Sequence, residues 1–159
     1  MPHLRGHYVR ILFNEEEIAE RNRELAEDIA AKGYRELLAV IVLKGAFVFA
    51  ADLVRALHLA GVTVTVECMS LSSYGASEQS SGEVRVIRDI QEDVTGRDIL
   101  LIDDILESGR TLAYAQKLLL ERGANRVDCA VLLQKPSRRV EKFEAAFTGF
   151  ECPDVFVVG

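Results

Sequence analysis

The chain has 159 residues, of which 49% are hydrophobic and 28% are charged, and its formal net charge is −6. This size and composition fit a single soluble domain, residues 1–159, with a real hydrophobic core. The negative balance argues against a nucleic-acid partner, because neutralising phosphates needs clustered Lys and Arg. The longest apolar run, residues 37–43, is too short to span a bilayer, so we expect no membrane partner.

The cysteines, Cys68, Cys129 and Cys152, lie far apart and form no CxxC pair. This spacing argues against a zinc site or a disulfide framework, and it fits thiols in a reducing cytosol. The first ten residues also lack the apolar run of a signal peptide. We therefore expect a cytoplasmic protein.

The first half of the chain alternates helices and strands. Residues 14–31 predict a helix, with Asn14 as its N-cap and three glutamates in its first turn. The apolar run 37–43 is typical of a strand buried on both faces. A helix at 47–59 and a strand at 63–71 follow, and the polar, Ser- and Gly-rich stretch 72–83 predicts a long loop.

The second half continues the alternation. We expect strands at 83–87, 97–102, 126–133, 147–150 and 155–158, with a helix at 111–122. The pattern predicts an α/β fold with a mainly parallel twisted sheet flanked by helices. Because ligands bind beyond the carboxyl ends of parallel strands, the residues that follow each strand are the candidates for a functional site.

The segment DDILESGRT, residues 103–111, follows a predicted buried strand and opens a helix. Free N–H groups at a helix start favour a phosphate, and Gly109 would let it approach the backbone. The hydroxyls of Ser108 and Thr111 can donate hydrogen bonds, and Arg110 adds a cation. An ordinary polar strand-to-helix turn would have a similar composition.

The adjacent carboxylates of Asp103 and Asp104 favour the binding interpretation, since two acids at the end of a hydrophobic strand are costly without a ligand. Ribose hydroxyls can donate to them, and Mg²⁺ prefers oxygen ligands. Glu107 is a third acid, which is either a general base or a charge at a helix start.

DDILESGRT resembles the phosphoribosyl pyrophosphate signature of the type I phosphoribosyltransferases. Four further segments occur in the order and spacing of the hypoxanthine(-guanine) phosphoribosyltransferases, so the resemblance extends from about residue 40 to the end of the chain. They are LKG (43–45), SSYGASEQSSGEVRV (72–86), LLQKPSRR (132–139) and GFECPDVFVVG (149–159).

The resemblance implies a purine-salvage enzyme. Such enzymes transfer the phosphoribosyl group of phosphoribosyl pyrophosphate to hypoxanthine or guanine, with Mg²⁺ as the cofactor, and release IMP or GMP and pyrophosphate. It also implies the type I phosphoribosyltransferase fold, with a small hood built from the N-terminal segment and from residues after about 135. A homodimer or homotetramer is the expected assembly.

On the phosphoribosyl side, the resemblance implies that Asp103 and Asp104 bind the ribose hydroxyls and the Mg²⁺. The 5′-phosphate would be held by the matched loop, which consists of Glu107, Ser108, Gly109, Arg110 and Thr111. Glu107 also matches the catalytic position that takes the proton from purine N7.

The pyrophosphate side is matched by Lys44, Gly45 and Arg139. A cation beside a polyanionic leaving group agrees with this role. Related enzymes also carry a non-proline cis peptide at the position of Leu43–Lys44. Ser73 and Tyr74 match contact residues of a lid, which would exclude water from an oxocarbenium-like sugar.

On the purine side, Lys135 matches the residue that contacts O6 of the base, Phe156 the aromatic that stacks on it, and Val157 a backbone contact to it. Lys has donors and no acceptor, so it favours a 6-oxo group over the 6-amino group of adenine.

The sequence departs from the family pattern in three places. Asp103 stands where Glu is more common, and Glu107 stands where the base is usually Asp, which moves the carboxylate by roughly 1.5 Å. Related enzymes also continue past the position of Gly159 with an Asp at the base and an Arg near the pyrophosphate. The resemblance therefore implies a C-terminal tail, disordered or deleted, that is missing from this sequence.

Two alternatives remain at this point. One is a regulatory protein of the same fold that senses phosphoribosyl pyrophosphate, which the net charge of −6 disfavours. The other is a transferase that prefers xanthine and differs only in its choice of base.

Overall fold

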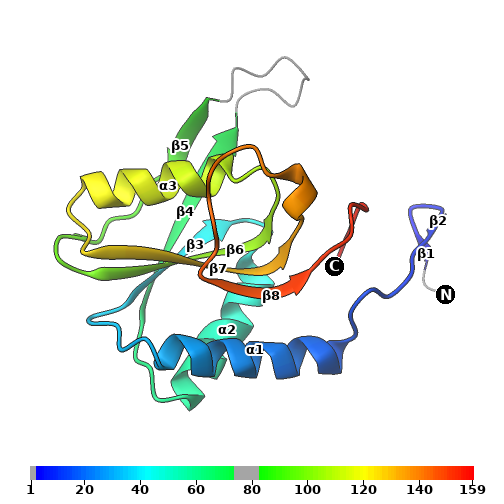
Figure 1. Cartoon of the computed structure of the whole chain (residues 1–159), viewed down its shortest axis with the longest axis horizontal. Helices are drawn as coiled ribbons and strands as arrows, with labels where there is room; N and C mark the ends of the chain where they lie inside the picture. The colour runs from blue at the N-terminus through cyan, green and yellow to red at the C-terminus, as the bar shows by residue number, and fades with distance from the viewer. Residues whose placement is uncertain (1–2, 74–82) are drawn as a thin grey trace.

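The computed structural model describes residues 3–73 and 83–159 (Figure 1). Its main feature is a six-stranded sheet in the order β5-β4-β3-β6-β7-β8, parallel except for the antiparallel pair of β4 and β5. The strands are β3 (Leu38–Leu43), β4 (Thr65–Ser73), β5 (Val84–Arg88), β6 (Asp98–Leu106), β7 (Arg126–Gln134) and β8 (Phe147–Glu151). The expected α/β fold with a mainly parallel sheet is confirmed.

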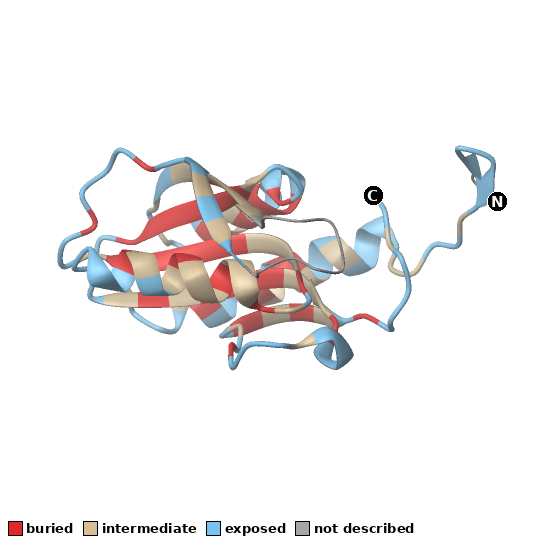
Figure 2. Ribbon diagram, turned by 90° about the horizontal axis from the view of Figure 1, so that it is seen from above, coloured by how far each residue is buried: buried red, intermediate tan, exposed pale blue. Residues whose placement is uncertain are grey.

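Helices cover both faces of the sheet, with α1 (Glu15–Ala30) and α2 (Phe47–Leu59) on one face and α3 (Arg110–Glu121) on the other (Figure 1). The alternation of side chains along β3 explains why both faces are apolar. Leu38, Val40 and Val42 join the core under α3, whereas Ala39 and Ile41 join the core under α1 and α2. Figure 2 shows the central strands as buried on both faces.

Local signals in the sequence fix the ends of α1. The side chain of Asn14 accepts a hydrogen bond from the Glu17 backbone N–H, and Glu17 Oε2 accepts one from the Asn14 N–H, each at 2.8 Å. This reciprocal capping box satisfies two otherwise unpaired donors. The predicted N-cap is therefore confirmed.

None of the helices in the described ranges is long and apolar enough to cross a membrane.

The strand predicted at 155–158 is wrong, because this segment has no sheet partner. The free edge of β8 is already engaged by Arg21, whose Nε and Nη2 donate to the carbonyls of Gly149 and Thr148. The chain instead turns tightly, and the N–H of Val155 donates to the carbonyl of Pro153 at 2.7 Å.

The strand predicted at 97–102 is longer than expected. β6 continues to Leu106, with Asp103 beside Val131 and Ile105 beside Leu133 of β7. The acidic pair therefore lies within the strand rather than after it, because β7 supplies ladder partners up to Gln134.

The connectivity places the ends of two central strands side by side. From β3 the sheet continues to β4 on one side and to β6 on the other, so β3 and β6 flank the point where the strand order reverses. In open α/β sheets, ligands bind at such a switch point, beyond the carboxyl ends of the strands. Two short elements complete the chain near this end: the hairpin of β1 (His3–Leu4) and β2 (His7–Tyr8), and the 3₁₀ helix η1 (Pro136–Arg138).

Candidate active site

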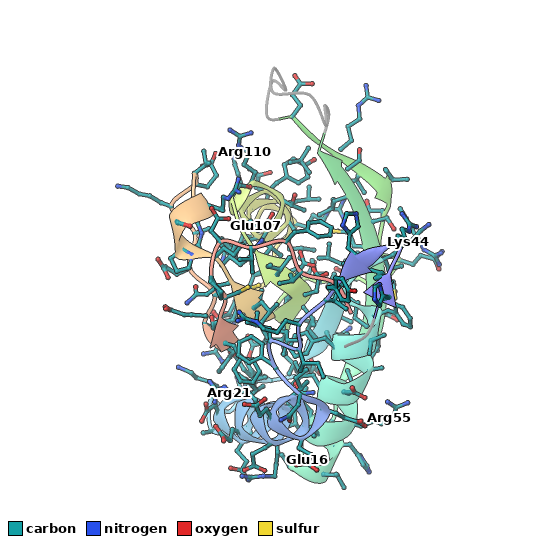
Figure 3. The ribbon with its side chains drawn as sticks, turned by 90° about the vertical axis from the view of Figure 1, so that its right-hand side faces the viewer. Glu16, Arg21, Lys44, Arg55, Glu107 and Arg110 are labelled. Carbon is teal, nitrogen blue, oxygen red and sulfur yellow. The ribbon has the colours of Figure 1, made fainter. Side chains whose placement is uncertain are left out.

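The carboxyl ends of β3 and β6 meet at Gly45 and Asp104. A Cβ atom at Gly45 would overlap Asp104 Oδ2, so the close approach of the carboxylate requires glycine at this position. Lys44 is exposed beside it, and the peptide bond between Leu43 and Lys44 is cis, as the resemblance implies. Figure 3 looks onto this end of the sheet, with Lys44 on one side and Glu107 and Arg110 on the other.

Asp103 and Asp104 form a pair of carboxyl groups without a cationic side-chain partner among the described residues. Asp103 Oδ1 accepts a hydrogen bond from the Asp104 N–H, and Asp104 Oδ1 accepts one from the Ile105 N–H, each at 2.8 Å. Burial, together with a side-chain hydrogen bond to Asp104 and the negative charge of Asp104, raises the pKa of Asp103 to about 8, although the bond from the Asp104 N–H acts in the opposite direction. A bound cation or hydroxyl donors would stabilise the negative charge of these two carboxyl groups.

The loop between β6 and α3 has the geometry of an anion site. Gly109 is the N-cap of α3 in the left-handed region, with φ +84°, and it has no side chain to cap the helix. Ser108 Oγ accepts a hydrogen bond from the Arg110 N–H at 3.3 Å. The following N–H groups of the first turn, those of Thr111 and Leu112, remain available to a phosphate at the positive end of the helix dipole.

The structure joins Glu107 to Lys135, two residues that the sequence separates by a helix and a strand. Lys135 Nζ donates to Glu107 Oε1 at 2.8 Å. Lys135 is buried, with only 6% of its surface exposed, whereas the Glu107 side chain is 48% exposed. A cationic donor and a carboxylate acceptor therefore stand side by side at the start of the loop of residues 107–111.

The segment that carries Phe156 and Val157 follows β8. Phe156 is 92% exposed, so its ring does not belong to the core, and Val157 is half-buried. The segment is tied to the Lys135 region by Arg138 Nε, which donates to Asp154 Oδ1 at 2.8 Å. An exposed aromatic ring at the edge of the site is available to stack on a planar ligand.

Arg139 binds main-chain carbonyl groups through its guanidinium. Its Nε donates to the carbonyl of Glu107 at 3.1 Å, and its Nη1 donates to the carbonyl of Phe143 at 2.6 Å. Of the two lid residues, Ser73 ends β4, and Tyr74 lies outside the described residues.

One contribution to the site was not predicted from the sequence. The Ser108 carbonyl accepts hydrogen bonds from the N–H groups of Val140 and Glu141, at 2.9 and 3.0 Å. Such contacts use only main-chain atoms, so the side-chain pattern of residues 140–143 carries no signal for them. The basic residues Arg138, Arg139 and Lys142 in the same stretch are the local signal that this segment lies near an anion site.

Comparisons with known proteins identify the family of the chain. The phosphoribosyl transferase domain family matches residues 9–159. The chain is 42% identical to a hypoxanthine-guanine phosphoribosyltransferase from Dictyostelium discoideum, with 94% of this chain and 84% of that protein covered. It is 41% identical to the enzyme of that name from Aquifex aeolicus, covering 100% of this chain and 89% of the relative. A structure of Trypanosoma cruzi hypoxanthine phosphoribosyl transferase superposes with a TM-score of 0.89 at 36% identity, covering 99% and 85% of the two chains.

Proposed function

Because the chain belongs to the phosphoribosyl transferase domain family, we propose that it transfers phosphoribosyl from phosphoribosyl pyrophosphate to hypoxanthine or guanine in purine salvage. The products are IMP or GMP and pyrophosphate. The observation that carries the choice of base is the pair of Lys135 and Glu107, 2.8 Å apart beside the phosphate loop. A 6-oxopurine protonated at N7 presents O6, an acceptor, next to N7–H, a donor, and the pair matches that edge.

In this proposal, Glu107 accepts the N7 proton as N9 attacks C1′ of the ribose and the bond to pyrophosphate breaks. Lys135 donates to O6, while Phe156 stacks on the base and Val157 contacts it through its backbone. The Glu107 carboxylate lies beside the group that would bind O6, so the two side chains are placed to face neighbouring atoms of one purine edge.

The phosphoribosyl group binds along β6 and the start of α3. The carboxylates of Asp103 and Asp104 accept from the ribose hydroxyls, and the 5′-phosphate lies on the N–H groups and side chains of residues 107–111. The phosphate position is supported by the left-handed conformation of Gly109 and by the start of α3 that follows it. Lys44 and Gly45 hold the pyrophosphate across the switch point, and Ser73 and Tyr74 serve as contact residues of a lid.

We propose Mg²⁺ as the cofactor, bound at Asp103 and Asp104. Within the described ranges, no group of three or more His, Cys, Asp or Glu side chains could hold a metal by itself. Mg²⁺ fits a site of this kind, because it keeps several waters and takes one or two carboxylates together with substrate phosphates. When bound, it would neutralise charge on the pyrophosphate as this group leaves.

We further propose a homodimer or homotetramer that works in the cytoplasm. The assembly is supported by exposed apolar side chains on α2 and the neighbouring β4, namely Phe47, Val48, Leu59 and Val66. The location is supported by the three cysteines, which are all free. The hairpin of β1 and β2, with residues after about 135, would form the hood.

Nucleotide synthesis tests the proposed function. The protein is incubated with phosphoribosyl pyrophosphate, Mg²⁺ and each of hypoxanthine, guanine, xanthine and adenine, and products are separated by chromatography. We expect IMP and GMP, no AMP, and no product when EDTA replaces Mg²⁺. Absence of nucleotide from every base would overturn the proposal, and XMP as the main product would reassign the base.

A further inference from the structure

Residues 135–143, which we call the strap, bind main-chain carbonyl groups at the end of β6 and at the start of the loop of residues 107–111, which we call the phosphate loop. The Lys135 N–H donates to the Leu106 carbonyl at 2.8 Å, and Arg139 Nε donates to the Glu107 carbonyl at 3.1 Å. The Ser108 carbonyl accepts two further bonds from strap N–H groups, at 2.9 and 3.0 Å. Three successive carbonyls are therefore held by one segment.

Peptide planarity gives this arrangement a consequence for the ligand. In a trans peptide the N–H of one residue points away from the carbonyl of the residue before it. Fixing the Glu107 and Ser108 carbonyls toward the strap therefore points the N–H groups of Ser108 and Gly109 away from it. Among the described residues neither of these two N–H groups has a hydrogen-bond partner. They are free to bind an anion.

Arg139 holds the strap against the loop. Its guanidinium joins the Glu107 carbonyl to the Phe143 carbonyl, and Phe143 is anchored in the core under α3. The stem of Arg139 also packs on the loop, because a Cβ at Gly109 would lie 3.2 Å from Arg139 Cδ and 3.3 Å from Phe143 Cβ. The remaining nitrogen, Nη2, is buried and has no partner among the described residues. A ligand approaching from solvent cannot reach it.

We propose that Arg139 is a positioning residue for the 5′-phosphate loop and does not contact pyrophosphate. This inference rests on the proposed function, because it assigns the loop to the 5′-phosphate of the same substrate. Arg139 orients the Glu107 carbonyl directly, and by holding the strap against the loop it keeps the strap N–H groups on the Ser108 carbonyl before the ligand arrives. The preorganised N–H groups then bind phosphate without reorganisation.

The test compares binding of ribose 5-phosphate and of phosphoribosyl pyrophosphate by calorimetry, each in the presence of Mg²⁺. The variants are R139M, which keeps the stem and loses every donor, and R139K, which keeps the charge but cannot bridge two carbonyls. R138M is the matched control, because Arg138 is exposed and pairs with Asp154 instead of the loop.

We expect R139M to raise the Kd of both ligands by the same factor, on the order of 10-fold or more. R139K should lie between R139M and wild type, and R138M should bind both ligands as wild type does. A loss confined to phosphoribosyl pyrophosphate would overturn the proposal and return Arg139 to the pyrophosphate.

Folding and function are separated by two further readouts. If R139M fails to fold by circular dichroism, R139K decides, and wild-type affinity of R139K for ribose 5-phosphate would overturn the inference. Wild-type protein that binds neither ligand and forms no nucleotide would remove the proposed function and this inference together. Normal nucleotide synthesis with unchanged ribose 5-phosphate binding in R139M would remove the inference alone.

Discussion

Two aspartates of β6, one at its start and one near its carboxyl end, are in opposite electrostatic states. Asp98 begins the strand and is 2% exposed, and its carboxylate accepts hydrogen bonds from the Arg35 N–H and from Asn125 Nδ2, both at 2.7 Å. Although burial opposes its charge, these bonds and the charge of Arg126 hold the pKa of Asp98 below its usual value. At the other end, burial and Asp104 raise the pKa of Asp103 to about 8.

The difference separates Asp98, an acid that the fold itself pairs, from Asp103, which we propose binds a ligand. The donors to Asp98 all come from the protein. The Asp98 carboxylate therefore links the loops that carry Arg35 and Asn125 at the amino end of the sheet, and it also faces Arg126. Asp103 has the Asp104 N–H as a donor but no cation among the described side chains. A buried carboxyl pair with a raised pKa is a common feature of functional sites, where a ligand supplies the partner that the protein lacks.

The largest effect is expected at the carboxyl end, from Glu107→Gln. Gln cannot accept the N7 proton, so we expect kcat to fall by about 10²- to 10⁴-fold. The amide oxygen can still accept from Lys135 Nζ, so the free energy of unfolding should change by less than about 1 kcal/mol. Steady-state kinetics and urea unfolding measure the two quantities. Full activity in this variant would show that Glu107 is not the base.

Asp103→Asn sharpens the comparison, because it should lower activity without lowering stability. Loss of one carboxylate at the ribose and Mg²⁺ site should reduce kcat/KM for phosphoribosyl pyrophosphate on the order of 10²-fold. The raised pKa means that ionising Asp103 opposes folding, so the variant should be at least as stable as wild type at pH 7 in EDTA. A clear drop in the midpoint of urea unfolding would contradict this reading of the acidic pair.

Much of the fold could be predicted from local patterns. The buried run of β3 and the capping residues of α1 are short-range signals, and the structure follows both. The strand predicted at 155–158 failed for a long-range reason, since the apolar pattern is adequate but Arg21 occupies the edge where it would pair.

The candidate site likewise has a part that local sequence predicts and a part that depends on long-range contacts. The segment 103–111 is contiguous, so its acids, glycine and hydroxyls could be recognised together in the sequence. The contact of Glu107 with Lys135 and the close approach of Gly45 to Asp104 join distant segments. They depend on sheet order, which residue spacing alone does not specify. The role of the Ser108 carbonyl is still harder to predict, because any residue can supply the main-chain donors that bind it.

Asp98→Asn is the matched experiment at the amino end of the strand. The amide would place its own N–H groups against the donors of Arg35 or Asn125, and the charge that Arg126 faces would be lost. We expect the free energy of unfolding to fall by about 2–4 kcal/mol. At temperatures where the variant is folded, kcat and KM should stay within about twofold of wild type, since the change lies at the opposite end of β6. Reduced activity in the folded variant would mean that the two ends are coupled.

The smallest expected effect is the pH dependence of stability, and its sign differs between the two ends. Because the pKa of folded Asp98 lies below the unfolded value of about 3.9, its charge stabilises the fold above that pH. This contribution is lost as the pH falls below about 4. The stability difference between wild type and Asp98→Asn should therefore shrink between pH 6 and pH 3.

Asp103 should act in the opposite direction, because a raised pKa makes wild type lose stability as the pH rises from about 4 toward 8. The Asp103→Asn variant lacks that loss. Urea titrations of both variants across this range, in EDTA, would measure the two slopes. Slopes of the same sign would show that the carboxyl groups at the two ends of β6 do not differ in the way their partners imply.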